Sequence, residues 1–99
     1  MNDDAYKNLA LAVVNQAVSD YKTFARADNR VLHDMSNTIM GGAYIIKHKN
    51  HLSIMSEIES LERWFKGDTC DLYLQDVISR DELVRQLRLY KKANRETLY

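Results

Sequence analysis

The sequence of 99 residues contains no proline, three glycines and a single cysteine, Cys70. Without proline the chain lacks the strongest helix breaker, and without repeated glycine turns it lacks the signals that separate β-strands, so helices are favoured. One cysteine excludes an internal disulfide, and no basic and then apolar leader begins the chain, so we expect a protein of the reducing cytoplasm. No apolar run approaches the roughly 18 residues that a membrane span needs.

Net charge is also absent, because 14 lysine and arginine residues balance 14 aspartate and glutamate residues. This balance excludes an overall field that would draw the protein to nucleic acid or to an anionic membrane. The charges are segregated along the chain: residues 53–79 carry six acidic and two basic side chains, whereas residues 80–99 carry six basic and three acidic ones. Either helices of opposite charge pack together or across a dimer interface, or a basic face binds phosphate or an acidic face mimics nucleic acid.

The sequence does contain enough apolar surface for one folded domain, since 45% of its residues are hydrophobic and 28% are charged. A chain of this length buries only about two thirds of its unfolded surface, so it would gain stability from a partner subunit. Leu11, Val14 and Val18 also widen the apolar stripe of the N-terminal segment beyond one helix face. We therefore expect a single helical domain over residues 1–99 that forms a homo-oligomer.

Apolar residues recur at three- and four-residue steps along most of the chain, which is the spacing of amphipathic helices. The pattern predicts an all-α fold, a compact bundle of four main helices with a short helix near residues 69–76. Asp28 or Asn29 is a candidate cap of the second main helix, and Ser79 with Glu82 forms a capping box before the last. The main helices are expected at about residues 3–26, 29–48, 53–66 and 80–95.

Gly41 and Gly42 interrupt the second of these helices, where each glycine costs about 1 kcal/mol relative to alanine. The pair has three interpretations: a kink or a close packing contact, the end of a helix, or a backbone position that a ligand approaches closely. The sequence leaves the three open, because no longer phosphate-binding loop pattern surrounds the glycines.

The most informative polar feature is a basic stripe on the last helix, whose members fall within a sector of roughly 80° at 100° per residue. It consists of Arg85, Arg88, Lys92 and Arg95. The stripe is either a solvated face that favours the helix dipole, or an anion site in which the cations take phosphate oxygens and Tyr90 or Tyr73 stacks on a base. A second basic cluster would frame a phosphate pocket if it met the stripe, within one subunit or across a dimer. That cluster consists of Lys47, His48, Lys49 and His51.

Few other residues carry chemistry. His48 and His51 lie three residues apart but lack a third metal ligand, and neither a nucleophile motif nor an oriented base is visible. We therefore expect no metal, no cofactor and no catalytic residue, and not an enzyme. Trp64 and Phe65 either anchor the core of the third helix or offer an aromatic wall to a partner protein.

Two stretches of the chain, which together cover about a quarter of it, are Ala12–Tyr21 and Glu59–Asp68 followed by Glu82–Arg88. These stretches resemble small helical proteins encoded by phages and prophages of Gram-positive bacteria. The resemblance implies a small binding protein without catalytic activity in the cytoplasm of an infected or lysogenic bacterium. Some proteins of this size and origin neutralise bacterial immunity, either by trapping a nucleotide signal or by covering the nucleic-acid surface of an effector.

Taken with the basic residues, this resemblance predicts a counter-defence protein that sequesters a phosphorylated nucleotide signal through the stripe and the second cluster. One alternative is a protein–protein inhibitor of a host defence effector such as a nuclease, which would use the acidic third helix or an exposed aromatic face. A further alternative is a small nucleic-acid-binding regulator, whose affinity would fall steeply with salt.

Overall fold

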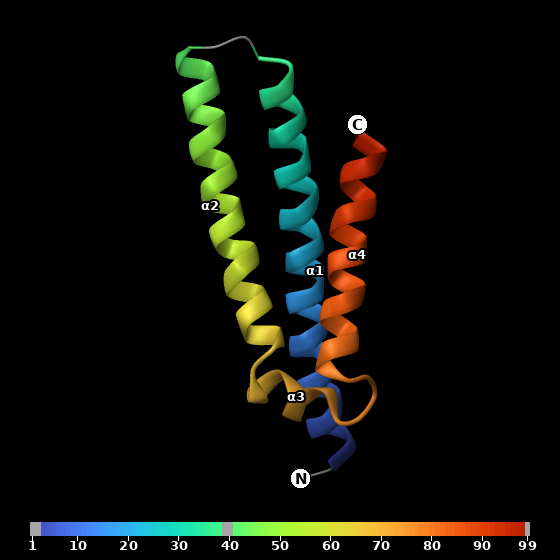
Figure 1. The fold of residues 1–99 in the computed structure, drawn as a ribbon. Helices are drawn as coiled ribbons and strands as arrows, with labels where there is room; N and C mark the ends of the chain where they lie inside the picture. The colour runs from blue at the N-terminus through green and yellow to red at the C-terminus, as the bar shows by residue number, and fades with distance from the viewer. Residues whose placement is uncertain (1–2, 39–40, 99) are drawn as a thin grey trace.

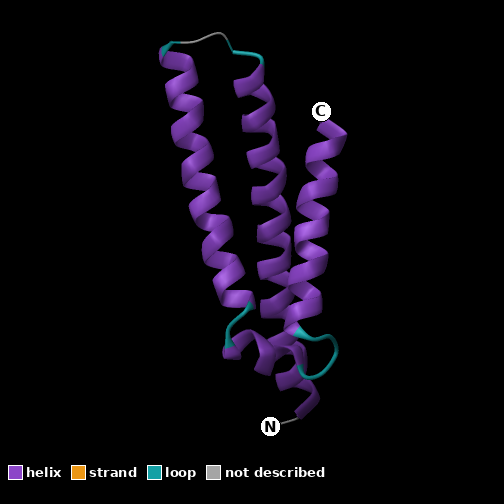
Figure 2. Cartoon of the chain, in the orientation of Figure 1, coloured by secondary structure: helices purple, strands orange, loops and turns teal. Residues whose placement is uncertain are grey.

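The computed structural model describes residues 3–38 and 41–98, and it folds them into helices without any strand (Figures 1 and 2). The predicted all-α class is therefore confirmed for this part of the chain. Within these residues, no helix combines the length and the apolar character that crossing a membrane requires. The helices are α1 (Asp3–Ser36), α2 (Gly42–Phe65), α3 (Asp68–Leu74) and α4 (Arg80–Leu98).

The three long helices form an elongated bundle of 58 × 22 × 18 Å with α1 as its central element. α2 runs back antiparallel to α1, and α4 returns along another side of α1 (Figure 1). The short α3 crosses the end of the bundle beside the first turns of α1. α2 and α4 each pack mainly on α1 and contact each other little.

The predicted break near residues 26–29 is wrong, because α1 continues without interruption to Ser36. Asp28 and Asn29 have the side chains of helix caps, but both point inward and are fully buried. There Asp28 contacts His51 of α2, and Asn29 donates to Asn94 Oδ1 of α4 at 2.9 Å. Both side chains thus find partners on neighbouring helices, and neither caps a break in the backbone of α1.

Gly41 and Gly42 mark the start of a helix, so the expected second and third helices have different bounds. α2 begins at Gly42 and runs through the expected gap at residues 49–52 to Phe65. Gly41 is its N-cap residue and has a φ of 135°, a backbone conformation that residues with a Cβ rarely adopt. Of the three interpretations of the glycine pair, the structure therefore supports a helix boundary.

The C-terminal third of the chain follows the sequence pattern closely. α3 corresponds to the short helix expected near residues 69–76. α4 begins at Arg80, and the preceding Ser79 side chain accepts a hydrogen bond of 3.2 Å from the Glu82 backbone N–H. Only half of the expected capping box forms, because the Glu82 carboxylate binds Arg85. Gln75 and Asp76 join the two helices with left-handed backbone conformations.

A compact core lies where α1, α2, α3 and α4 meet, in the lower half of the view in Figure 1. Tyr21 and Phe65 pack edge to face at its centre, with ring centroids 6.2 Å apart. Each large apolar side chain buried here contributes about 1.5–3 kcal/mol to folding. The buried cluster consists of Val14, Tyr21, Ile58, Phe65, Cys70, Leu74, Leu83, Val84 and Leu87.

Candidate functional site

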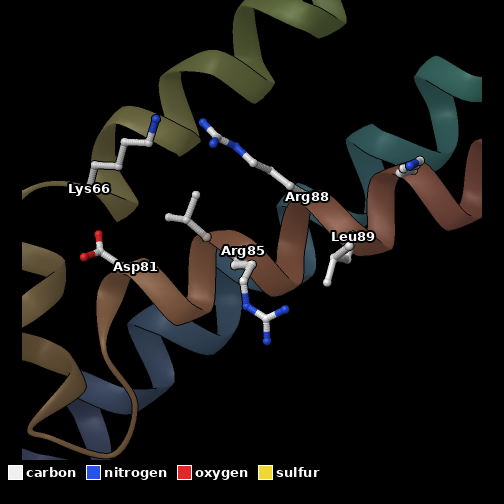
Figure 3. A pocket seen from close by; sticks show the side chains of 7 residues that line it. Lys66, Asp81, Arg85, Arg88 and Leu89 are labelled. Atoms are coloured by element: carbon white, nitrogen blue, oxygen red, sulfur yellow. The ribbon is translucent and has the colours of Figure 1, made fainter.

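The end of α2 and the first half of α4 border an open groove of about 470 Å³, which we call the α2/α4 groove (Figure 3). A second hollow of about 310 Å³ continues it towards the middle of the bundle and shares Arg88 and Lys92 with it. Four of the seven lining side chains are basic and one is acidic, so the groove carries an excess of positive charge. The lining residues are Lys66, Asp81, Val84, Arg85, Arg88, Leu89 and Lys92.

Arg88 extends from α4 across the groove towards α2 (Figure 3). Its Nη2 lies 3.7 Å from Oε2 of Glu62, a loose ion pair, and more than half of the Arg88 side chain remains exposed. Glu62 in turn accepts a hydrogen bond of 2.9 Å from the buried hydroxyl of Tyr21, whose pKa is raised by burial and by this carboxylate. Tyr21 and Glu62 therefore hold Arg88 in the groove while leaving its guanidinium accessible.

Arg85 points to the opposite side of α4 from Arg88 (Figure 3). Its Nε and Nη2 both donate to the carboxylate of Glu82 one turn earlier in the helix. These bonds, together with one from Gln86, lower the pKa of Glu82 to about 2, and the same contact raises the pKa of Arg85. The guanidinium of Arg85 is thus already paired, and the predicted stripe does not present four free cations on one side.

Lys66 completes the groove from the α2 side, where Figure 3 shows it near Arg88. In the part of the chain that the structure describes, neither Lys66 nor Lys92 forms an ion pair with a carboxylate. Lys66 is not among the candidate residues that the sequence indicates, because nothing local links it to Arg88, 22 residues later. Lys66 comes to lie near Arg88 because α2 and α4 both pack on α1.

The second basic cluster lies in the first half of α2, at the far end of the bundle from the start of α4 (Figure 1). None of its members lines the α2/α4 groove. Within one subunit, the two basic clusters therefore do not frame a common pocket. Arg95 lies on α4, but its side chain is outside the described residues.

Tyr90 faces α1 and not the groove. Its hydroxyl accepts a hydrogen bond of 3.3 Å from Arg26, and the ammonium group of Lys22 lies 5.1 Å from the centre of its ring. Stacking of Tyr90 on a base bound between Arg88 and Lys92 is therefore inconsistent with the geometry.

Of the two interpretations of Trp64 and Phe65, the packing shows the first: Phe65 is part of the core, and Trp64 packs against it. Phe65 is fully buried, and Trp64 packs edge-on against it with ring centroids 5.5 Å apart. Tyr73 of α3 covers another side of Trp64 at 6.5 Å. An aromatic pair at the end of an amphipathic helix thus anchors α3 to α2.

Asp28 and His51 form a buried polar pair that the sequence did not predict. Nδ1 of His51 lies 2.6 Å from Oδ1 of Asp28, while Oδ2 of the same carboxylate is buried and has no hydrogen-bond partner among the described residues. The His51 side chain keeps about a fifth of its surface exposed. Across residues 3–38 and 41–98, no group of three histidine, cysteine, aspartate or glutamate side chains is placed to hold a metal ion.

No known protein family, characterised protein or solved structure matches this chain.

Proposed function

We propose that this chain is a binding protein without catalytic activity, and that it holds a phosphorylated nucleotide in the α2/α4 groove. The observation that carries the proposal is the convergence of Lys66 and Arg88 from two helices, with Lys92 beside them. Two of these three cations have no carboxylate partner in the described structure, and the third has only a loose one at 3.7 Å.

The groove suits a ligand that carries negative charge and also has some apolar surface. Ammonium and guanidinium groups form charge-assisted hydrogen bonds with phosphate oxygens, and these bonds are about twice as strong as neutral ones. Val84 and Leu89 line the same groove and offer apolar contact to a base or a sugar face. Phosphate at Arg88 would exchange the loose contact with Glu62 for a closer one, while Tyr21 keeps Glu62 hydrogen-bonded.

Sequestration of a nucleotide needs only binding, and the chain's resemblance to small phage and prophage proteins supplies the biological setting. A nucleotide that signals infection to host effectors would lose that activity while it occupied the groove. We accordingly infer a counter-defence role in the cytoplasm of an infected bacterium, with the signal nucleotide as ligand and no reaction performed on it.

Isothermal titration of the chain with cyclic dinucleotides, cyclic mononucleotides and ADP-ribose derivatives tests the proposal. The double variant R88E/K92E should weaken binding at least about tenfold, because it replaces two attractive charges by repulsive ones. The matched control R30E/R63E makes the same change of net charge at exposed positions outside the groove and should bind as the unaltered chain does. The proposal would be contradicted if no nucleotide gave heat of binding, or if R88E/K92E and R30E/R63E lost the same amount of affinity.

A second candidate function, inhibition of a host protein, is favoured by the exposed apolar side chains. Leu72 and Val77 near α3 are about 70% exposed, and so much apolar surface in water is typical of sites that bind another protein. Co-purification with a host nuclease or effector that persists in R88E/K92E and is lost in a Leu72 variant would support this alternative.

A further inference from the structure

Glu62 is the acidic member of the second hollow, which has a volume of about 310 Å³ and continues the α2/α4 groove. The other residues that line this hollow, Arg88, Lys91 and Lys92, are all basic. The Glu62 side chain is only 21% exposed, so its carboxylate lies largely inside the protein. Because a carboxylate repels phosphate at short range, Glu62 is suited to contact another part of a bound nucleotide.

The two oxygens of the Glu62 carboxylate have different partners. Oε1 accepts a hydrogen bond of 2.9 Å from the hydroxyl of Tyr21, a fully buried residue of the core. Oε2 lies 3.7 Å from Nη2 of Arg88, which is longer than a hydrogen bond. Lys91 is turned to Met55 of α2, with 3.8 Å between Nζ and Sδ. Tyr21 therefore fixes one oxygen of the carboxylate, while Oε2 can still accept a hydrogen bond from a ligand.

Binding of phosphate at Arg88 would make a donor for Oε2 necessary. A phosphate that draws the guanidinium of Arg88 to itself weakens its contact with Glu62, while the Glu62 side chain stays largely buried. A buried carboxylate oxygen that loses its partner and gains no hydrogen bond costs free energy. The ligand that binds best therefore brings both a phosphate for Arg88 and a hydrogen-bond donor for Glu62.

The short distance between Arg88 and Glu62 limits which donor of a nucleotide can serve. Nη2 and Oε2 are 3.7 Å apart, so the donor must lie close to the phosphate that Arg88 binds. In a ribonucleotide with a 3′-phosphate, the neighbouring carbon of the sugar carries the 2′-hydroxyl, whereas the amino groups of the base lie farther away. Aspartate and glutamate side chains accept hydrogen bonds from this hydroxyl in dinucleotide-binding proteins.

We propose that Glu62 accepts a hydrogen bond from the 2′-hydroxyl of a ribonucleotide whose 3′-phosphate is bound by Arg88, an inference that rests on the proposed function. The ligands of this class are ribonucleotides with a 3′-phosphate, including 3′,5′-cyclic and 3′,5′-linked forms with a free 2′-hydroxyl. Deoxyribonucleotides lack the donor, and the 2′-hydroxyl is what distinguishes the two sugars at such a site.

Isothermal titration of the unaltered full chain with the 3′-phosphates of adenosine, guanosine, cytidine and uridine tests this inference. At least one of them should bind, and its 2′-deoxy form should bind at least about tenfold more weakly, because Oε2 is then buried without a donor. The 5′-phosphate of the same nucleoside has the same composition and charge. It should also bind about tenfold more weakly, because its 2′-hydroxyl lies far from the phosphate.

The variant E62M assigns this preference to Glu62, because methionine has a similar length and accepts hydrogen bonds only weakly. It should reduce the preference for the ribonucleotide over its 2′-deoxy form to about twofold or less. A general effect on the groove would change both affinities alike and leave the preference intact. The control E59M makes the same substitution at an exposed position of α2 that lines neither hollow, and it should keep the preference.

The results separate this inference from the proposed function. Equal binding of a 3′-ribonucleotide and its 2′-deoxy form, or an unchanged preference in E62M, would overturn the role of Glu62 even if R88E/K92E weakens nucleotide binding as expected. Absence of binding by all four 3′-phosphates would overturn it as well. The proposed function fails only if no nucleotide of the wider panel binds, or if binding does not depend on Arg88 and Lys92.

Discussion

Asp28 is the clearest case of a side chain whose role depends on a distant partner. Its carboxylate is fully buried, one oxygen contacts His51 at 2.6 Å, and the other has no hydrogen-bond partner in the described structure. Removing the partner of a buried charged group strongly destabilises the fold, because the protein interior solvates the remaining charge poorly. The pair therefore holds the middle of α1 and α2 in one register, at some cost in stability.

The variant H51L should lower the free energy of unfolding by about 3 kcal/mol, because it leaves the Asp28 carboxylate buried without its donor. The double variant D28L/H51L should recover most of this loss, since it removes both polar groups together. Urea denaturation followed by circular dichroism measures the free energy of unfolding of the single and the double variant. Equal destabilisation of the single and the double variant would show that packing, and not the unpaired charge, determines the effect.

Glu82 should make the stability of the fold depend on pH at acidic values. Its bonds to Arg85 and Gln86 lower its pKa from 4.5 to about 2 in the folded chain. The folded pKa lies below the unfolded one, so the contribution is fully present above about pH 4.5 and is lost as the pH falls through about 2. The variant E82Q should be less stable than the unaltered chain at pH 6, and the difference should disappear by about pH 2 in thermal melts. The difference is small, because Glu82 and Arg85 lie at the surface.

Among the helices, α2 shows most directly how a backbone conformation determines a boundary. Gly41 has φ 135° and ψ −164°, a region that is essentially restricted to glycine, whereas Gly42 is the first residue of the helix. A Cβ at either position would meet no other atom within 4 Å. The effect of a substitution at the two glycines therefore comes from the backbone alone.

We expect G41A to lower the free energy of unfolding by about 2 kcal/mol, because alanine is strained at this φ. G42A should instead raise it by up to about 1 kcal/mol, because alanine suits a helix and loses less entropy on folding. Chemical denaturation of the two variants gives the comparison directly. If G41A proved as stable as G42A, the α1–α2 connection would not need the conformation seen at Gly41.

The bundle as a whole separates its core from its charged and apolar surfaces. The core lies in the half that contains α3, where all four helices meet, whereas the first half of α2 packs on α1 with its outer face open.

The all-α class and the positions of α3 and α4 follow from the sequence by itself. Apolar spacing of three and four residues is a local property, and so is the hydrogen bond between Ser79 and the Glu82 backbone, so α3 and α4 are close to their predicted bounds. The same locality explains the error at Asp28, which has the side chain of a cap but finds its partner 23 residues later in α2.

The candidate site depended on tertiary structure. Periodicity places Arg85, Arg88 and Lys92 near one another on α4, but the sequence does not show which carboxylate each cation meets. Arg85 is paired with Glu82 in its own helix, whereas Arg88 reaches Glu62 of α2 and lies beside Lys66 in the same groove. The sequence by itself determines which charged side chains each helix carries. Only the packing of the helices determines which of these charges face one another across a groove.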